Sequence, residues 1–138
     1  SGDIDPAIIF FLLKKGFLRK KVEEILVKKS GLLGVSEISS DVRDLWAKYK
    51  KGNAGARRTL HWFAYRIAKY IGAYAAALGG LDCIVFTGGI GEHAWYLRKW
   101  ILAYLTSFSK KHVLVIPTDE EKKIAEIVCR QILLSSKN

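Results

Sequence analysis

The chain has 138 residues, half of them hydrophobic and 26% charged. This balance is typical of a folded globular chain and excludes a disordered one. The longest apolar run, residues 7–13, is too short to cross a bilayer, and no N-terminal signal pattern precedes it. Two cysteines are too few for a disulfide framework or a zinc site. We therefore expect a cytoplasmic protein that does not bind membranes.

The beginning of the chain suggests a fragment. The sequence contains no methionine and starts at Ser1 and Gly2. The length suits one domain, or one half of a larger domain. We expect a chain that has been truncated or processed at its front end.

Lysine and arginine exceed aspartate and glutamate by ten charges, 23 against 13. Such a balance raises the hypothesis of a basic nucleic-acid-binding module. However, the basic residues of segment 14–29 fall between apolar positions at helical spacing, and no known nucleic-acid-binding motif accompanies them. We favour a solvated, charged surface over nucleic-acid binding.

The first half of the chain predicts helices separated by short turns. Asp5 and Pro6 form an N-cap and first helical position for a helix that Gly16 ends. A second helix is expected over 19–29, followed by a short apolar link around 32–35.

Two further helices follow. The group Ser39-Ser40-Asp41 predicts the start of a helix that runs to Lys50. The strongest helical periodicity covers 54–78 and ends at Gly79. Its small residues between 72 and 77 suggest a central, buried helix that packs closely against its neighbours.

The second half alternates between strands and helices. Apolar runs at 83–87 and 113–116 predict buried strands covered on both faces. A glycine loop and a helix follow the first strand, and a helix beginning around 117–121 follows the second. The alternation indicates an α/β layer with parallel strands.

The segment Gly88-Gly89-Ile90-Gly91 is the most informative motif. It follows a predicted strand, and ligands of open α/β sheets bind at the carboxyl ends of strands. Glycines also let a backbone approach a ligand closely. The glycine spacing fits neither the P-loop nor the dinucleotide fingerprint. The alternative is a tight turn that binds nothing.

Two other groups could carry chemistry. Asp41 and Arg43 could reach a ribose hydroxyl or an adenine edge, or could form only a helix cap and a surface pair. Thr118 and Glu121 fit a capping box. That assignment leaves Glu120 free as an oxygen ligand for Mg²⁺, or as a surface acid that complements the helix dipole.

Histidines and tryptophans add little. The three histidines stand at no metal-ligand spacing, so we discard a metal cluster built on them, although His93 could touch a ligand bound at the glycine segment. The four tryptophans are scattered, which favours packing or an interface over a stacking platform.

Seven segments resemble the C-terminal part of acetate kinase, in the order of that family and over almost the whole chain. They are SGDIDP at 1–6, KSGLLG at 29–34, SSDVRD at 39–44, FAYR at 63–66, YIGAY at 70–74, FTGGIGE at 86–92 and VIPTDEE at 115–121.

The resemblance implies the ribonuclease H-like, actin-type ATPase fold, with ATP and Mg²⁺ in a cleft between two α/β domains. Residues 1–138 would be the C-terminal nucleotide-binding domain, without the N-terminal domain. The family transfers the γ-phosphoryl group of ATP to acetate, reversibly, and a homodimer is expected by analogy. The resemblance also assigns sites. Adenosine would contact Asp41, Val42 and Arg43, the second nucleotide-binding segment would comprise Gly89, Ile90, Gly91, Glu92 and His93, and Glu120 would belong to the Mg²⁺ site.

Three departures accompany the resemblance. In the family the acetate pocket and the catalytic residues come from the N-terminal domain, which we expect to be missing from this chain, so we assign no catalytic residue within it. His93 stands where the family usually has asparagine, and the link from Trp100 to Val113 is shorter than usual. The alternatives are a propionate kinase fragment, or a non-catalytic remnant that binds nucleotide or dimerises.

Overall fold

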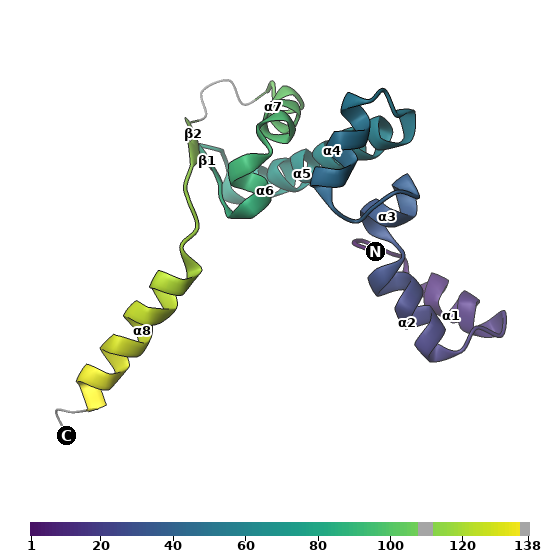
Figure 1. Cartoon of the computed structure of the whole chain (residues 1–138), viewed down its shortest axis with the longest axis horizontal. Coiled ribbons are helices and arrows are strands. Elements are labelled where there is room, and N and C mark those ends of the chain that lie inside the picture. Colours follow the sequence, from purple (N-terminus) through teal and green to yellow (C-terminus); the bar gives the residue numbers. More distant parts are fainter. Residues whose placement is uncertain (108–111, 136–138) are drawn as a thin grey trace.

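The computed structural model describes residues 1–107 and 112–135, apart from the side chains at 120, 130, 131 and 133–135. A central group of helices packs around one long helix, a two-helix arm leaves it at the N-terminal side, and a single helix extends from the other side (Figure 1). The elements in chain order are α1 (Pro6–Lys14), α2 (Arg19–Lys28), α3 (Gly31–Ser36), α4 (Val42–Lys50), α5 (Ala54–Leu78), β1 (Cys83–Phe86), α6 (Gly88–His93), α7 (Trp95–Ala103), β2 (His112–Val115) and α8 (Glu120–Ser135).

Local capping explains where several helices begin. The Asp5 carboxylate accepts a hydrogen bond of 2.8 Å from the Ala7 amide, which confirms the predicted start of α1. Asn53 caps α5 through a 2.8 Å bond from the Ala56 amide. Each cap satisfies a backbone donor that the helix itself leaves unpaired. The segment expected to be an apolar link instead forms α3, a helix of six residues.

The core lies where α5 meets α4 and α7. Leu45, Leu60 and Leu97, one from each of these helices, are almost fully inaccessible to solvent. Of the small residues at 72–77, only Ala75 is buried, whereas Ala73, Ala76 and Ala77 are exposed. The closest packing of α5 falls on Ala56, Ala64 and Ala68. Around Gly72 a side chain would meet no atom within 4 Å. Helix α5 therefore buries one face along its first two thirds, and apart from Ala75 its last six residues are exposed.

Strands β1 and β2 pair in parallel, as predicted, with Cys83 opposite His112 and Phe86 opposite Val115. The expectation that both faces are covered is wrong for the described residues. Ile84 and Phe86 are buried, whereas Val85 is 49% exposed, and every residue of β2 is exposed. Helix α8 leads away from the sheet instead of covering it (Figure 1).

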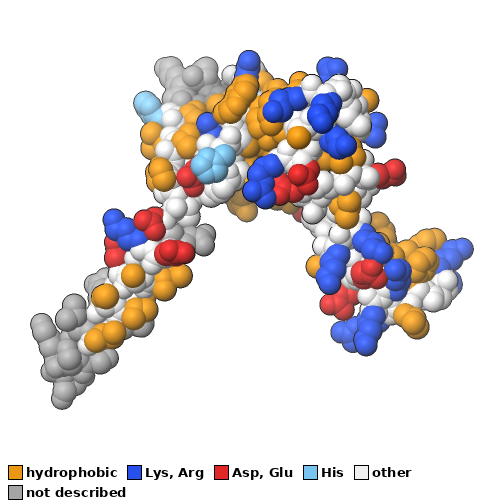
Figure 2. All heavy atoms as spheres, in the orientation of Figure 1, with side chains coloured by type: hydrophobic (Ala, Val, Ile, Leu, Met, Phe, Trp, Pro, Cys, Tyr) orange, Lys and Arg blue, Asp and Glu red, His pale blue; other side chains and the backbone are white. Residues whose placement is uncertain are grey.

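Basic side chains cover separate parts of the surface instead of forming one band. Figure 2 shows Lys and Arg gathered over the α1–α2 arm, over the region of α4 and on α8. The Lys21 and Lys29 ammonium groups both bind the Glu24 carboxylate, at 3.0 and 2.7 Å. This distribution fits a solvated charged surface. In the described part of the chain, no helix is long and apolar enough to cross a membrane.

Candidate functional site

The turn before α4 is held together by serine hydroxyls. The Ser36 hydroxyl accepts a bond from the Ile38 amide, and the Ser39 hydroxyl accepts one of 3.0 Å from the Asp41 amide. The Ser39 hydroxyl also donates to the Asp44 carboxylate at 2.8 Å. These bonds fix the backbone that presents Asp41 at the start of the helix.

Asp41 both caps α4 and pairs with Arg43. Its carboxylate accepts a 2.7 Å bond from the Arg43 amide and a forked pair of bonds from the Arg43 guanidinium, the shorter of 2.6 Å. These bonds lower the pKa of Asp41 from 3.8 to about 2. The arginine side chain is 90% exposed, so its outer face is open to a ligand.

The glycine segment is a helix and not the loop that its composition predicts. Gly88 begins α6 with a φ of +71°, which glycine adopts without strain. A side chain at Gly91 would lie 3.2 Å from the backbone of Phe86, a tight contact, so glycine lets α6 cross close to the end of β1. At Gly89 a side chain would meet nothing within 4 Å. The three glycines thus serve different purposes.

Thr118 links this helix to the segment before α8. Its hydroxyl lies 2.7 Å from the Thr87 hydroxyl and accepts a 2.7 Å bond from the Gly88 amide. Its own amide donates to the Glu92 carboxylate at 2.8 Å, which lowers the pKa of Glu92. The capping box predicted for Thr118 is therefore wrong, since the Asp119 carboxylate accepts from the Lys122 amide at 3.0 Å and caps α8 instead.

Arg98 closes the other end of α6. Its guanidinium donates two bonds of 2.7 Å, to the carbonyl oxygens of Gly91 and Glu92. These are carbonyls near the end of a helix, which a cation stabilises. No sequence motif pointed to Arg98.

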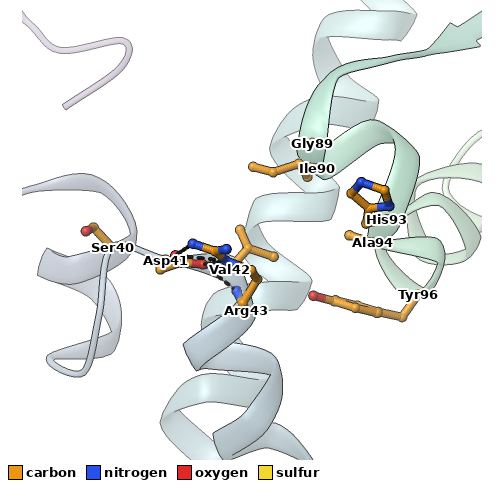
Figure 3. A pocket seen from close by; sticks show the side chains of 9 residues that line it. All are labelled: Ser40, Asp41, Val42, Arg43, Gly89, Ile90, His93, Ala94 and Tyr96. Carbon is orange, nitrogen blue, oxygen red and sulfur yellow. Dashed lines mark hydrogen bonds and ion pairs between the residues drawn. The ribbon is translucent and has the colours of Figure 1, made fainter. Parts of the chain in front are cut away.

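A cavity of about 550 Å³ lies between the start of α4 and the helices α6 and α7 (Figure 3). It joins segments almost fifty positions apart in the sequence. The lining residues are Ser40, Asp41, Val42, Arg43, Gly89, Ile90, His93, Ala94 and Tyr96.

Six of these lining residues belong to the two segments predicted to bind nucleotide: Asp41, Val42, Arg43, Gly89, Ile90 and His93. Gly91 and Glu92 are not among the lining residues: Gly91 packs against Phe86, and Glu92 bonds to Thr118. Glu120 begins α8, and its side chain lies outside the described residues. Within the described part of the chain, no three side chains of the types that bind metals come together.

Ser40, Ala94 and Tyr96 complete the lining, and the sequence predicted none of them as a binding residue. Tyr96 has the largest side chain of the three. The residue is only 6% exposed, and its ring stacks on Trp46, with ring centres 3.7 Å apart and planes 4° from parallel. Burial, together with the nearby charge of Asp41, raises the pKa of Tyr96, so the hydroxyl keeps its proton at neutral pH. The stacking of Trp46 on this ring fits the packing role expected for the tryptophans. The sequence signal that could have identified Tyr96 is its position, a few residues after the glycine segment.

Comparison with known proteins places this geometry in a family. The model of the acetokinase family matches residues 1–111. The chain is 44% identical over 155 residues to an acetate kinase of Agathobacter rectalis, a match covering 95% of this chain and 38% of that protein. It is 56% identical over 103 residues to an acetate kinase of Desulforamulus reducens, covering 74% of this chain and 26% of that one.

Solved structures agree. A crystal structure of Porphyromonas gingivalis acetate kinase superposes with a TM-score of 0.84 at 38% identity, covering 91% of this chain and 38% of that one. A propionate kinase from Francisella tularensis gives a TM-score of 0.79 at 32% identity, over 88% of this chain and 36% of that one. The expected α/β fold, of the ribonuclease H-like, actin-type ATPase class, is thereby confirmed.

The chain spans about two fifths of the length of the Agathobacter and Porphyromonas acetate kinases. The Agathobacter match runs over more residues than the chain possesses, so that relative carries extra residues inside the matched span. With seven tenths or more of its residues matched in each of these comparisons, the chain belongs to the acetokinase family.

Proposed function

We propose that this chain is the C-terminal nucleotide-binding part of an acetate kinase-type phosphotransferase. Such an enzyme transfers the γ-phosphoryl group of ATP to the carboxylate of acetate, giving acetyl phosphate and ADP, and runs in both directions. The observation that carries the proposal is the cavity between α4 and α6, lined by Asp41 and Arg43 on one side and Gly89 and Ile90 on the other.

The cavity suits an adenosine moiety in both size and lining. Val42, Ile90 and Ala94 supply apolar walls for a flat base. The exposed Arg43 guanidinium, held flat by Asp41, offers a plane for stacking and donors for ribose oxygens. We assign nucleotide binding to Asp41, Val42, Arg43, Gly89, Ile90 and His93. For Gly91 and Glu92 the proposed role is to hold α6 in place beneath the nucleotide.

We propose that Mg²⁺ binds this chain together with the nucleotide, whose phosphates supply most of its ligands. Mg²⁺ commonly takes one or two carboxylates together with the phosphates of the substrate. We propose Glu120, which begins α8, as the protein ligand, because its motif at 115–121 resembles that of the family. When bound, Mg²⁺ would supply neutralisation of the phosphate charge.

The transfer itself demands more cations than this cavity offers. A carboxylate is a weak nucleophile, and its attack on the γ-phosphorus brings negative charges together while the bond to the bridging oxygen breaks. Catalysis then depends on in-line positioning and on neutralising the equatorial oxygens. We place that machinery, with the acyl pocket, in a second domain of the complete enzyme. The work of the present residues is to bind and orient the nucleotide.

Propionate is the second candidate acceptor. The structural match to a propionate kinase is nearly as good as that to the acetate kinase. The cavity residues are assigned to the nucleotide, so they do not discriminate between acetate and propionate as the acceptor. We further propose that the enzyme works as a cytoplasmic homodimer.

Calorimetric titration of the chain with ADP, with and without Mg²⁺, tests the proposal. We expect saturable binding that Arg43→Ala weakens about tenfold, because charge-assisted contacts to a ligand are worth roughly 1.5–3 kcal/mol. Arg58→Ala is the matched control, since Arg58 is exposed and lies outside the cavity. A chain that fails to bind ADP even when the second domain is supplied would contradict the assignment.

A further inference from the structure

Tyr96 is a buried polar side chain whose hydroxyl has no assigned partner. The residue is 94% buried, yet it lines the cavity. Figure 3 shows its oxygen directed across the cavity, towards the start of α4. Among the described residues, the Tyr96 hydroxyl forms no hydrogen bond to another side chain or to the backbone, and since none of their buried polar side-chain atoms lacks a partner, its oxygen is open to the cavity and not sealed in the core. A hydroxyl held in this way is available to a ligand.

Neighbouring rings fix the direction of that hydroxyl. One face of Trp46 stacks on Tyr96, with ring centres 3.7 Å apart, and Tyr49 also stacks on Trp46 at 4.8 Å. Trp100 approaches the Tyr96 ring edge-on at 5.8 Å. Rotation of the tyrosine ring would break these contacts, so the position of the oxygen is set before any ligand arrives.

The lining around Tyr96 indicates which part of a nucleotide lies there. Ala94 and Val42, which also line the cavity, are apolar and almost fully buried. The charged pair of Asp41 and Arg43 occupies the exposed side. A base fits the closed, apolar end, and the ribose and phosphates fit the open, charged side. The base would then present to Tyr96 the edge opposite its bond to the ribose.

We propose that the Tyr96 hydroxyl hydrogen-bonds the 6-substituent of the purine base and so determines the affinity for the nucleotide. This inference rests on the proposed function and adds a specificity residue to it. In adenine the 6-amino group donates and the tyrosine oxygen accepts. A base that lacks the 6-amino group cannot form this bond, and a phenylalanine at position 96 cannot accept it.

The test compares two nucleotides on three proteins by calorimetry. The proteins are the unaltered chain, Tyr96→Phe and Tyr49→Phe. Tyr49 is the matched control, because it stacks on the same tryptophan but does not line the cavity. The nucleotides are ADP and purine riboside 5′-diphosphate, which lacks only the 6-amino group. Thermal unfolding of each variant checks that the fold is kept.

We expect Tyr96→Phe to weaken ADP binding about fivefold and to leave purine riboside diphosphate unchanged. Tyr49→Phe should bind both as the unaltered chain does. A second comparison needs no variant. The unaltered chain should bind purine riboside diphosphate about fivefold more weakly than it binds ADP.

The other outcomes separate the two proposals. If ADP binds the unaltered chain and Tyr96→Phe equally, the inference is overturned and the proposed function stands. Equal losses for both nucleotides would move the contact away from the 6-substituent and also overturn it. No binding of ADP to the unaltered chain, even with the second domain supplied, would remove the proposed function itself.

Discussion

The hydroxyls of Thr87 and Thr118 lie 2.7 Å apart, although 31 positions separate the two residues in the sequence. Thr87 follows β1 and Thr118 lies between β2 and α8, so this contact ties together the ends of both strands. The Gly88 amide donates to the same Thr118 oxygen. The start of the glycine helix is therefore held from outside that helix.

Replacing this threonine should loosen that junction. Thr118→Val keeps the shape of the side chain and removes the oxygen that accepts from Gly88. We expect a loss of about 1 kcal/mol in the free energy of unfolding, the usual net value of such a bond. Urea denaturation measures it. Thr106→Val is the control, because Thr106 is exposed, and equal effects of the two variants would show that the contact contributes nothing.

Acid should remove the contribution of Asp41 to stability. Folding lowers the pKa of this carboxyl from 3.8 to about 2, because the Arg43 side chain and amide bind its charged form. A group with a lowered folded-state pKa stabilises the fold above its unfolded pKa, and the stabilisation disappears as the pH falls towards the folded value. The loss should fall between pH 3.8 and about 2.

Unfolding free energies measured across this range, for the unaltered chain and for Asp41→Asn, test the assignment. The asparagine can still cap the helix, but it cannot titrate. The difference between the two proteins should shrink as the pH approaches about 2. A difference that stays constant down to that pH would show that the Arg43 pair contributes no stability.

The glycines of α6 should respond differently to alanine. Gly91→Ala places a methyl group 3.2 Å from the Phe86 backbone, so we expect about 1–2 kcal/mol of destabilisation. Gly89→Ala meets no atom within 4 Å and should leave stability unchanged or slightly higher.

For ADP binding, Gly89→Ala should have a larger effect than Gly91→Ala. Gly89 lines the cavity, so its added methyl group should weaken ADP binding several-fold. Gly91 does not line the cavity, so Gly91→Ala should affect stability and leave ADP affinity unchanged. Calorimetry and thermal unfolding of both variants provide the comparison. A destabilised Gly89→Ala with unchanged ADP affinity would contradict the placement of this residue.

Residues 1–138 by themselves should bind nucleotide without turning it over. We expect no acetyl phosphate above background when the purified chain is incubated with ATP, Mg²⁺ and acetate, because few cations surround the nucleotide site. Trapping acetyl phosphate with hydroxylamine provides the assay. Acetyl phosphate formation that Glu120→Ala abolishes would overturn this expectation.

The sequence by itself determined the elements whose signals are local. The start of α1 at Pro6, the span of α5 and the parallel pairing of the strands all follow from caps, helical periodicity and alternation. The motifs around Asp41 and Gly89 were likewise visible as separate segments. Each depends on residues within a few positions of one another, where spacing alone fixes the geometry.

Only the tertiary structure decided what these segments do together. The choice of Asp119 over Thr118 as the cap of α8 depends on Gly88 and Thr87, which compete for the Thr118 hydroxyl from another part of the chain. Tyr96 became a lining residue because Trp46, fifty positions earlier, fixes its ring against the cavity. Contacts between distant residues carry no periodicity, so they enter only when the chain has folded.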